Sequence, residues 1–106
     1  MARYIARIEL TGLKEGEDTF KLYDDLHGYL KKIKFERFYE GAASGKRQLP
    51  DATYLGMFEG TPAACRDAVV EAATKTGKKP RVVVAEVMAG TVATYGLQPY
   101  VEPTSS

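Results

Sequence analysis

The sequence has one cysteine, one histidine, no tryptophan and no asparagine among its 106 residues. A single cysteine excludes an internal disulfide, and one histidine with one cysteine cannot build a typical Cys/His zinc site. Without asparagine there is no acceptor for N-glycosylation. No stretch approaches the roughly 20 apolar residues of a membrane span, and the start, MARYIARIEL, lacks the apolar core of a signal peptide. We therefore expect a small cytoplasmic protein with no metal, no cofactor and no membrane partner.

Charge of one sign is also lacking, because 15 Lys and Arg residues face 14 Asp and Glu residues and leave a net charge of +1. Bulk basicity therefore gives no reason to expect nucleic-acid binding. If the chain binds nucleic acid, it must do so through a local basic patch.

Two kinds of periodicity divide the chain into strands and helices. Apolar and charged residues alternate at the start, which is typical of a half-buried strand, and three-four spacing marks two amphipathic helices. Asp18 or Thr19 can begin the first helix, whereas Thr61 with Pro62 can begin the second, which Gly77 closes. A valine-rich run near the end favours a central, well-buried strand. The expected elements are strands over 3–10, 34–40, 53–59 and 81–87 and helices over 19–33 and 62–76.

This order of elements predicts an α+β fold, the ferredoxin-like βαββαβ sandwich, with an antiparallel sheet and two helices on one face. The second and third strands are expected to form a hairpin around a loop of residues 41–50. We expect this domain to span residues 1–90. Residues 91–106 then form a C-terminal extension, in which residues 91–97 can add an edge strand and the end is loose.

Three side chains are candidates for chemistry. His27 lies one helical turn after Asp24, which can orient an imidazole and stabilise its charged form for acid–base work. Its alternative role is that of a residue beside the core that makes one hydrogen bond. Glu9, at the end of the first strand, can accept a proton or, in a dimer, bind a metal; alternatively it is a solvated residue or pairs with Arg7. Cys65 lies on an apolar helix face, so we expect a buried, unreactive thiol.

A local basic patch does occur in the middle of the chain. From Lys31 to Arg47 there are six basic and two acidic residues, an excess of four positive charges. Aromatic residues are interleaved with them, and this combination suits single-stranded nucleic acid, because basic groups attract phosphates and aromatic rings stack on unpaired bases. The alternative is a solvated hairpin with its aromatics in the core. The residues expected to contact RNA are Arg37, Tyr39, Lys46, Arg47 and Tyr54, the last across the hairpin.

Four strings carry a family resemblance: YIARIEL at 4–10, YDDLH at 23–27, FER at 35–37 and LPDATY at 49–54. Over about residues 3–88 the chain resembles the small endoribonuclease antitoxin family of type V toxin–antitoxin systems (GhoS-type). The resemblance implies a ferredoxin-like fold related to the CRISPR adaptation nucleases, and an antitoxin that cleaves the messenger RNA of a small membrane toxin. Those nucleases place an Asp near the end of the first strand, whereas this chain has Glu9-Leu10-Thr11. This difference speaks against a metal-dependent mechanism.

We therefore expect an RNA-binding endoribonuclease antitoxin that acts on single-stranded messenger RNA. Cleavage without metal would use the ribose 2′-OH as nucleophile, with His27 or Glu9 as the base and Arg37 as the stabilising cation.

The alternative is a non-catalytic dimeric interaction module that packs its open sheet face, or an edge, against a copy of itself or another protein. Ile5, Val83 and Val87 would give that face an apolar centre. We expect a homodimer, because a sheet with one bare face and an edge strand rarely stays unprotected.

Overall fold

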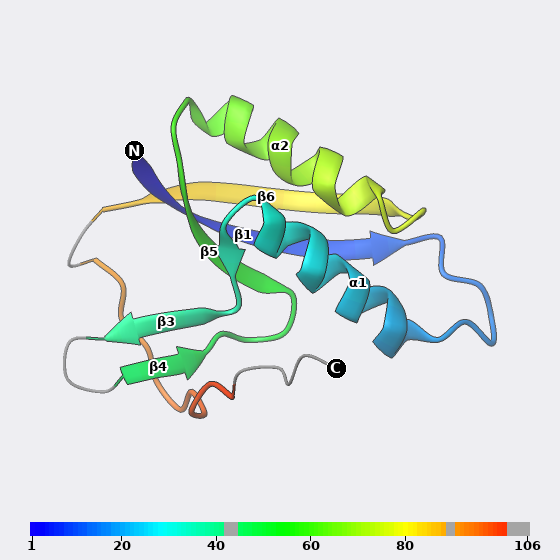
Figure 1. The fold of residues 1–106 in the computed structure, drawn as a ribbon, viewed down its shortest axis with the longest axis horizontal. Coiled ribbons are helices and arrows are strands. Elements are labelled where there is room, and N and C mark those ends of the chain that lie inside the picture. The colour runs from blue at the N-terminus through cyan, green and yellow to red at the C-terminus, as the bar shows by residue number, and fades with distance from the viewer. Residues whose placement is uncertain (42–44, 89–90, 102–106) are drawn as a thin grey trace.

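A four-stranded antiparallel sheet and two helices make up the fold in Figure 1, a computed structural model that describes residues 1–41, 45–88 and 91–101. The architecture is mixed α+β, as the sequence predicts. The sheet contains β1 (Ala2–Thr11), β2 (Phe35–Glu36), β5 (Thr53–Phe58) and β6 (Lys79–Val87), in the order β2-β5-β1-β6. Every neighbouring pair is antiparallel, so β1 lies in the middle with β5 on one side and β6 on the other.

The two helices begin where the sequence places their caps. In α1 (Thr19–Lys32), the Asp18 side chain accepts a hydrogen bond from the backbone N–H three residues later, at 3.1 Å. In α2 (Pro62–Thr74), Thr61 makes the same contact at 3.1 Å, and the helix ends two residues earlier than predicted. These bonds satisfy N–H groups that a helix leaves without partners in its first turn. Neither helix in the described part of the chain is long and apolar enough to cross a membrane.

The core lies between the helices and one face of the sheet. Side chains of β1 alternate as predicted, and those of Tyr4, Ala6, Ile8 and Leu10 are at most 3% exposed. Both helices pack against this set, so they cover the same face, as Figure 1 shows. The buried cluster contains Tyr4, Ala6, Ile8, Leu10, Leu26, Leu30, Phe35, Tyr54, Cys65, Val69, Ala72 and Ala73. The opposite face of the sheet carries the charged residues of β1.

The valine-rich strand β6 is an edge strand, so the prediction of a central place for it is wrong. In the described residues it pairs only with β1. Its side chains alternate: Val82 and Val84 pack against the core, whereas Val83 is 69% exposed on the open face. A run of valines is compatible with both places, because burial of one face is enough to favour β-branched residues.

The predicted hairpin between the second and third strands is divided into two parts. Of the predicted second strand, residues 34–40, only the part that forms β2 pairs with β5. The chain then forms a separate two-stranded sheet from β3 (Phe38–Gly41) and β4 (Gly45–Gln48). The prediction of a loop over residues 41–50 is therefore wrong for β4; residues 42–44 lie outside the described part. Tyr54 lies on β5 and pairs with Ala6 in the main sheet, so it is not part of the β3–β4 hairpin.

The segment after residue 90 returns to this hairpin instead of adding an edge strand to the main sheet. In the described residues 91–101, no strand forms over 91–97. Gln48 N donates to Gln98 O at 2.8 Å, and Tyr100 N donates to Lys46 O at 3.1 Å. The Tyr100 ring lies 4.9 Å from that of Phe38. The expected loose end, residues 102–106, lies outside the described residues.

Candidate functional site

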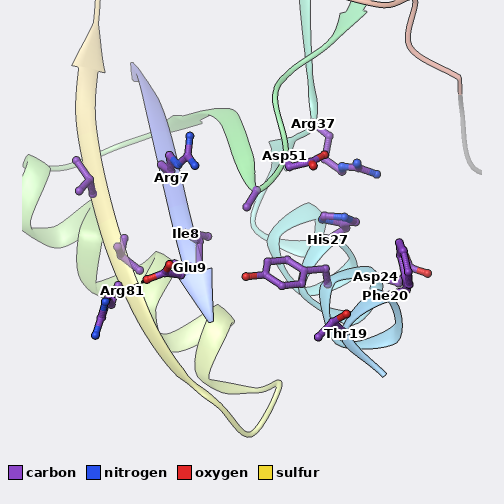
Figure 2. Close-up of a pocket in the computed structure, with 14 residues that line it drawn as sticks. Arg7, Ile8, Glu9, Thr19, Phe20, Asp24, His27, Arg37, Asp51 and Arg81 are labelled. Atoms are coloured by element: carbon purple, nitrogen blue, oxygen red, sulfur yellow. Dashed lines mark hydrogen bonds and ion pairs between the residues drawn. The ribbon is translucent and has the colours of Figure 1, made fainter. Parts of the chain in front are cut away.

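A cavity of about 940 Å³ lies between β1 and α1 (Figure 2). It forms because β1 runs on beyond β5, whose pairing with it ends at Arg7. Further along β1, the Leu10 N–H donates to the Tyr23 hydroxyl of α1 at 3.1 Å, so a helix side chain replaces a neighbouring strand. The charged and titratable residues lining this cavity include Arg7, Glu9, Asp24, His27, Arg37, Asp51 and Arg81.

These residues come from segments far apart in the sequence. Figure 2 shows Arg7 and Glu9 on one side of the cavity and Asp24 and His27 on the other, on α1. Arg37 stands just before β3, where its carbonyl accepts a hydrogen bond from the backbone that follows β4, at 2.8 Å. The base of the hairpin therefore adjoins the cavity.

His27 is half-buried and bonded to the core, not to its neighbour on the helix. Its Nδ1 lies 2.6 Å from the hydroxyl oxygen of Tyr54, whose side chain is fully buried. The expected partner, Asp24, makes no hydrogen bond with the imidazole in the described structure; it does line the same cavity. The single hydrogen bond matches the alternative role, a residue beside the core, and His27 also lines the cavity.

The environment of His27 favours the neutral imidazole. Burial lowers its pKa to about 4, and the positive charge of Arg37 acts in the same direction. The carboxylates of Asp24 and Asp51 oppose this shift in pKa without cancelling it. Desolvation disfavours the charged form of a base, and here it outweighs the nearby acids. His27 is thus neutral at pH 7.

The arginines of the cavity differ in their partners. Arg81 lies 3.3 Å from Glu9 in an exposed ion pair, so the expected pairing of Glu9 with Arg7 is wrong. The strand register explains this, because Glu9 stands directly opposite Arg81. Among the described residues, the side chains of Arg7 and Arg37 have no ion pair or hydrogen bond. Two guanidinium groups are therefore available to a ligand, which suits an anion with several oxygen atoms.

The structure brings together the three candidate catalytic residues, since His27, Glu9 and Arg37 all line this cavity. It separates them from most of the expected RNA-binding residues. Tyr39 lines a second cavity of about 270 Å³, and Lys46 and Arg47 lie on β4. The Lys46 ammonium stands 4.5 Å from the centre of the Phe38 ring.

Two placements bear on the other predicted site residues. Tyr54 is fully buried, so its ring has no free face for a base and the expected stacking role does not fit this placement. Cys65 is also fully buried, as predicted, and burial raises the pKa of its thiol. No group of three or more His, Cys, Asp or Glu side chains that can hold a metal ion occurs within the described residues.

Sequence reasoning missed several residues of the cavity. Arg7 stands two residues before Glu9 on the same face of β1, which the alternation of that strand could have shown. Arg81 enters the cavity through the pairing of β1 with β6, and Asp51 enters through the return of the chain after β4. Neither feature has a local sequence signal. Phe20 was also missed, although a large apolar side chain that is 85% exposed on α1 falls outside the apolar stripe of that helix.

Comparison of the chain with protein-family models, with curated proteins and with solved structures finds no match.

Proposed function

We propose that this protein is an RNA-binding endoribonuclease of the GhoS-type antitoxin class, and that the cavity between β1 and α1 is its active site. One observation carries the proposal. Glu9, His27 and Arg37 come from a strand, a helix and a connecting segment, and they line a single cavity. A cavity that gathers titratable groups from distant segments is a preferred place for a functional site.

We further infer that the fold is ferredoxin-like. The strand order β2-β5-β1-β6 and the placement of both helices on one face support this assignment. An enzyme of this class would act in the cytoplasm on the messenger RNA of a small membrane toxin.

The proposed reaction is the attack of a ribose 2′ oxygen on the adjacent phosphorus. The bond from this oxygen to phosphorus forms, and the bond from phosphorus to the 5′ oxygen breaks. The products are a 2′,3′-cyclic phosphate and a free 5′-hydroxyl. Arg37 would hold the non-bridging oxygens, on which negative charge develops. Glu9 and His27 are the candidate proton acceptors for the 2′-OH, and the leaving 5′ oxygen takes a proton from water.

The hairpin extends the proposed site. Lys46 and Arg47 would hold phosphates of the strand, and half-buried Tyr39 would offer its ring to a base. Arg37 joins the two regions, because it lines the cavity and precedes β3 directly.

The proposal is tested with end-labelled single-stranded RNA, with and without a chelator. We expect cleavage that leaves a cyclic phosphate end, and we expect Arg37→Gln to lower kcat/KM by about 10²–10³-fold. The matched control is Lys75→Ala, an exposed cation at the end of α2 and outside the basic patch. If Arg37→Gln cleaves as fast as the wild type, the site is misplaced. Absence of any cleavage would contradict the proposed endoribonuclease activity.

Binding is tested separately with Lys46→Ala/Arg47→Ala. The slope of log affinity on log salt should shrink by about 1.4, at about 0.7 for each lost phosphate contact. The control pair, Lys75→Ala/Lys79→Ala, removes equal charge from exposed positions at the end of α2 and the start of β6. Equal effects of the two pairs would show that the hairpin is not the RNA-binding surface.

One observation favours the second candidate, a dimeric interaction module. On the open face of the sheet, Val83 is 69% and Met57 is 41% exposed, and half-buried Ile5 lies between their strands. An apolar patch of this kind is commonly an interaction surface. Sedimentation equilibrium of the wild type and of Val83→Lys tests it. A dimer that Val83→Lys dissociates supports this role, and a monomeric wild type at tens of micromolar, on the order of usual assay concentrations, excludes the homodimer.

A further inference from the structure

We propose that Tyr54 is a positioning residue that fixes the tautomer of His27: its hydroxyl donates to Nδ1, so that the ring proton stays on Nε2 and the imidazole presents an N–H to the cavity. The tautomer itself follows from the packing of these two residues. Its role in cleavage rests on the proposed function.

The direction of the hydrogen bond follows from the burial of Tyr54. The hydroxyl oxygen lies 2.6 Å from Nδ1, and Tyr54 is fully buried. No other hydrogen-bond partner of this hydroxyl is found in the part of the chain that the structure describes. A buried O–H without an acceptor is costly, so the hydroxyl must donate its hydrogen bond to Nδ1. Burial also raises the pKa of Tyr54, which keeps that proton on the hydroxyl.

The other ring nitrogen of His27 reaches the cavity. Nε2 has no hydrogen-bond partner among the described residues, and no buried side-chain nitrogen or oxygen there is left unpaired. Nε2 is therefore accessible, and the open space that His27 lines is the cavity. Because the imidazole is neutral at pH 7, it carries one ring proton. With Nδ1 occupied as an acceptor, that proton is on Nε2.

This tautomer determines which residues of the site can act as the base and which can bind phosphate. An Nε2–H in the cavity that Arg37 also lines can bind a phosphoryl oxygen but cannot remove a proton from a 2′-OH. Of the two candidate bases, this leaves Glu9, whose carboxylate lies on the opposite side of the cavity from His27 (Figure 2). His27 and Arg37 then form a clamp for one phosphate group.

The tautomer can be read directly by NMR, because the chain contains a single histidine. Long-range ¹H–¹⁵N correlations of histidine-labelled protein at pH 7 distinguish a protonated Nε2 from a protonated Nδ1. We expect Nε2 to carry the proton, with a preference of roughly 5- to 150-fold, the range that follows from one unpaired buried donor. A wild-type protein with its proton on Nδ1 overturns the proposal, and this measurement needs no variant and no RNA.

Variants then test the part played by each tyrosine. Tyr54→Phe removes the donor and keeps the ring, so we expect a mixture of the two tautomers. Tyr23→Phe is the matched control, because its hydroxyl lies at the same cavity but accepts from the β1 backbone. It should leave the tautomer unchanged. An unchanged tautomer in folded Tyr54→Phe would show that Tyr54 does not set it.

The donor role is tested by cleavage of single-stranded RNA. His27→Gln places an amide N–H near the position of Nε2 and has no basic nitrogen, whereas His27→Ala has neither. We expect His27→Gln to keep more activity than His27→Ala. Equal loss in both variants refutes the donor role. If the wild type cleaves no RNA while Nε2 is protonated, the proposed function fails and the tautomer assignment stands.

Discussion

Acidification is expected to destabilise the fold through His27. Burial and the charge of Arg37 hold the pKa of His27 at about 4, against an ordinary value of 6.5. Between these two values the unfolded chain binds a proton that the folded protein does not, so the free energy of unfolding falls as the pH falls. Above 6.5 both states are neutral at His27, and the stability is then independent of this group.

The size of the effect follows from the two pKa values. Their separation corresponds to roughly 3 kcal/mol, at about 1.4 kcal/mol for each pH unit. The imidazole is only half-buried, and solvent screens part of this difference. We therefore expect a loss of about 1–3 kcal/mol between pH 7 and pH 4.

Urea unfolding of the wild type and of His27→Gln at several pH values measures this loss. The variant has no group that titrates here, so the difference between the two proteins isolates His27. The hydrogen bond from Lys78 lowers the pKa of Glu17, so protonation of Glu17 in acid also lowers the free energy of unfolding. This contribution is the same in both proteins. Parallel stability curves between pH 6.5 and 5 would refute the reasoning. A wild type that gains stability on acidification would show that Asp24 and Asp51 outweigh burial.

Three further substitutions test the packing, each by urea or thermal unfolding. Cys65→Ser should cost about 1–3 kcal/mol without reducing RNA cleavage, because it places a hydroxyl in the core; a folded but inactive variant would reveal a reactive thiol. Gly56→Ala should cost at least about 1–3 kcal/mol, because its Cβ would stand 2.7 Å from the Lys34 carbonyl oxygen; unchanged stability would mean that β2 shifts freely. Thr61→Ala should cost about 1 kcal/mol by removing the cap of α2, and a neutral effect would show that water replaces it.

Local signals were enough to predict β1 and both helices. The alternation in β1 and the caps Asp18 and Thr61 depend on residues a few positions apart, and the structure confirms them. Strand β4, of sequence GKRQ, has no apolar alternation, so only its backbone pairing with β3 makes it a strand. The place of β6 at an edge is also decided by long-range pairing, because a run of valines is compatible with either an edge or a central strand.

The candidate site shows the same limit more sharply. His27 could be singled out because it is the only histidine, and the three candidate catalytic residues do share a cavity. Its true hydrogen-bond partner, Tyr54, lies 27 residues away in the sequence and becomes a neighbour only when β5 packs beneath α1. Arg81 meets Glu9 through a strand register that spans 72 residues. Interactions of this length have no signature in one sequence.

The return of residues 98–100 to β4 has a consequence for self-association. Backbone groups of Lys46 and Gln48 that point away from β3 are bonded to Gln98 and Tyr100, so this edge of the hairpin is closed. An open strand edge is a template for intermolecular strand addition and for aggregation. A chain shortened to residue 90 would keep the main sheet but expose this edge, on a hairpin that carries few apolar residues to bury. Loss of residues 98–100 would therefore first produce oligomers joined by β-strand pairing, before any unfolding of the core.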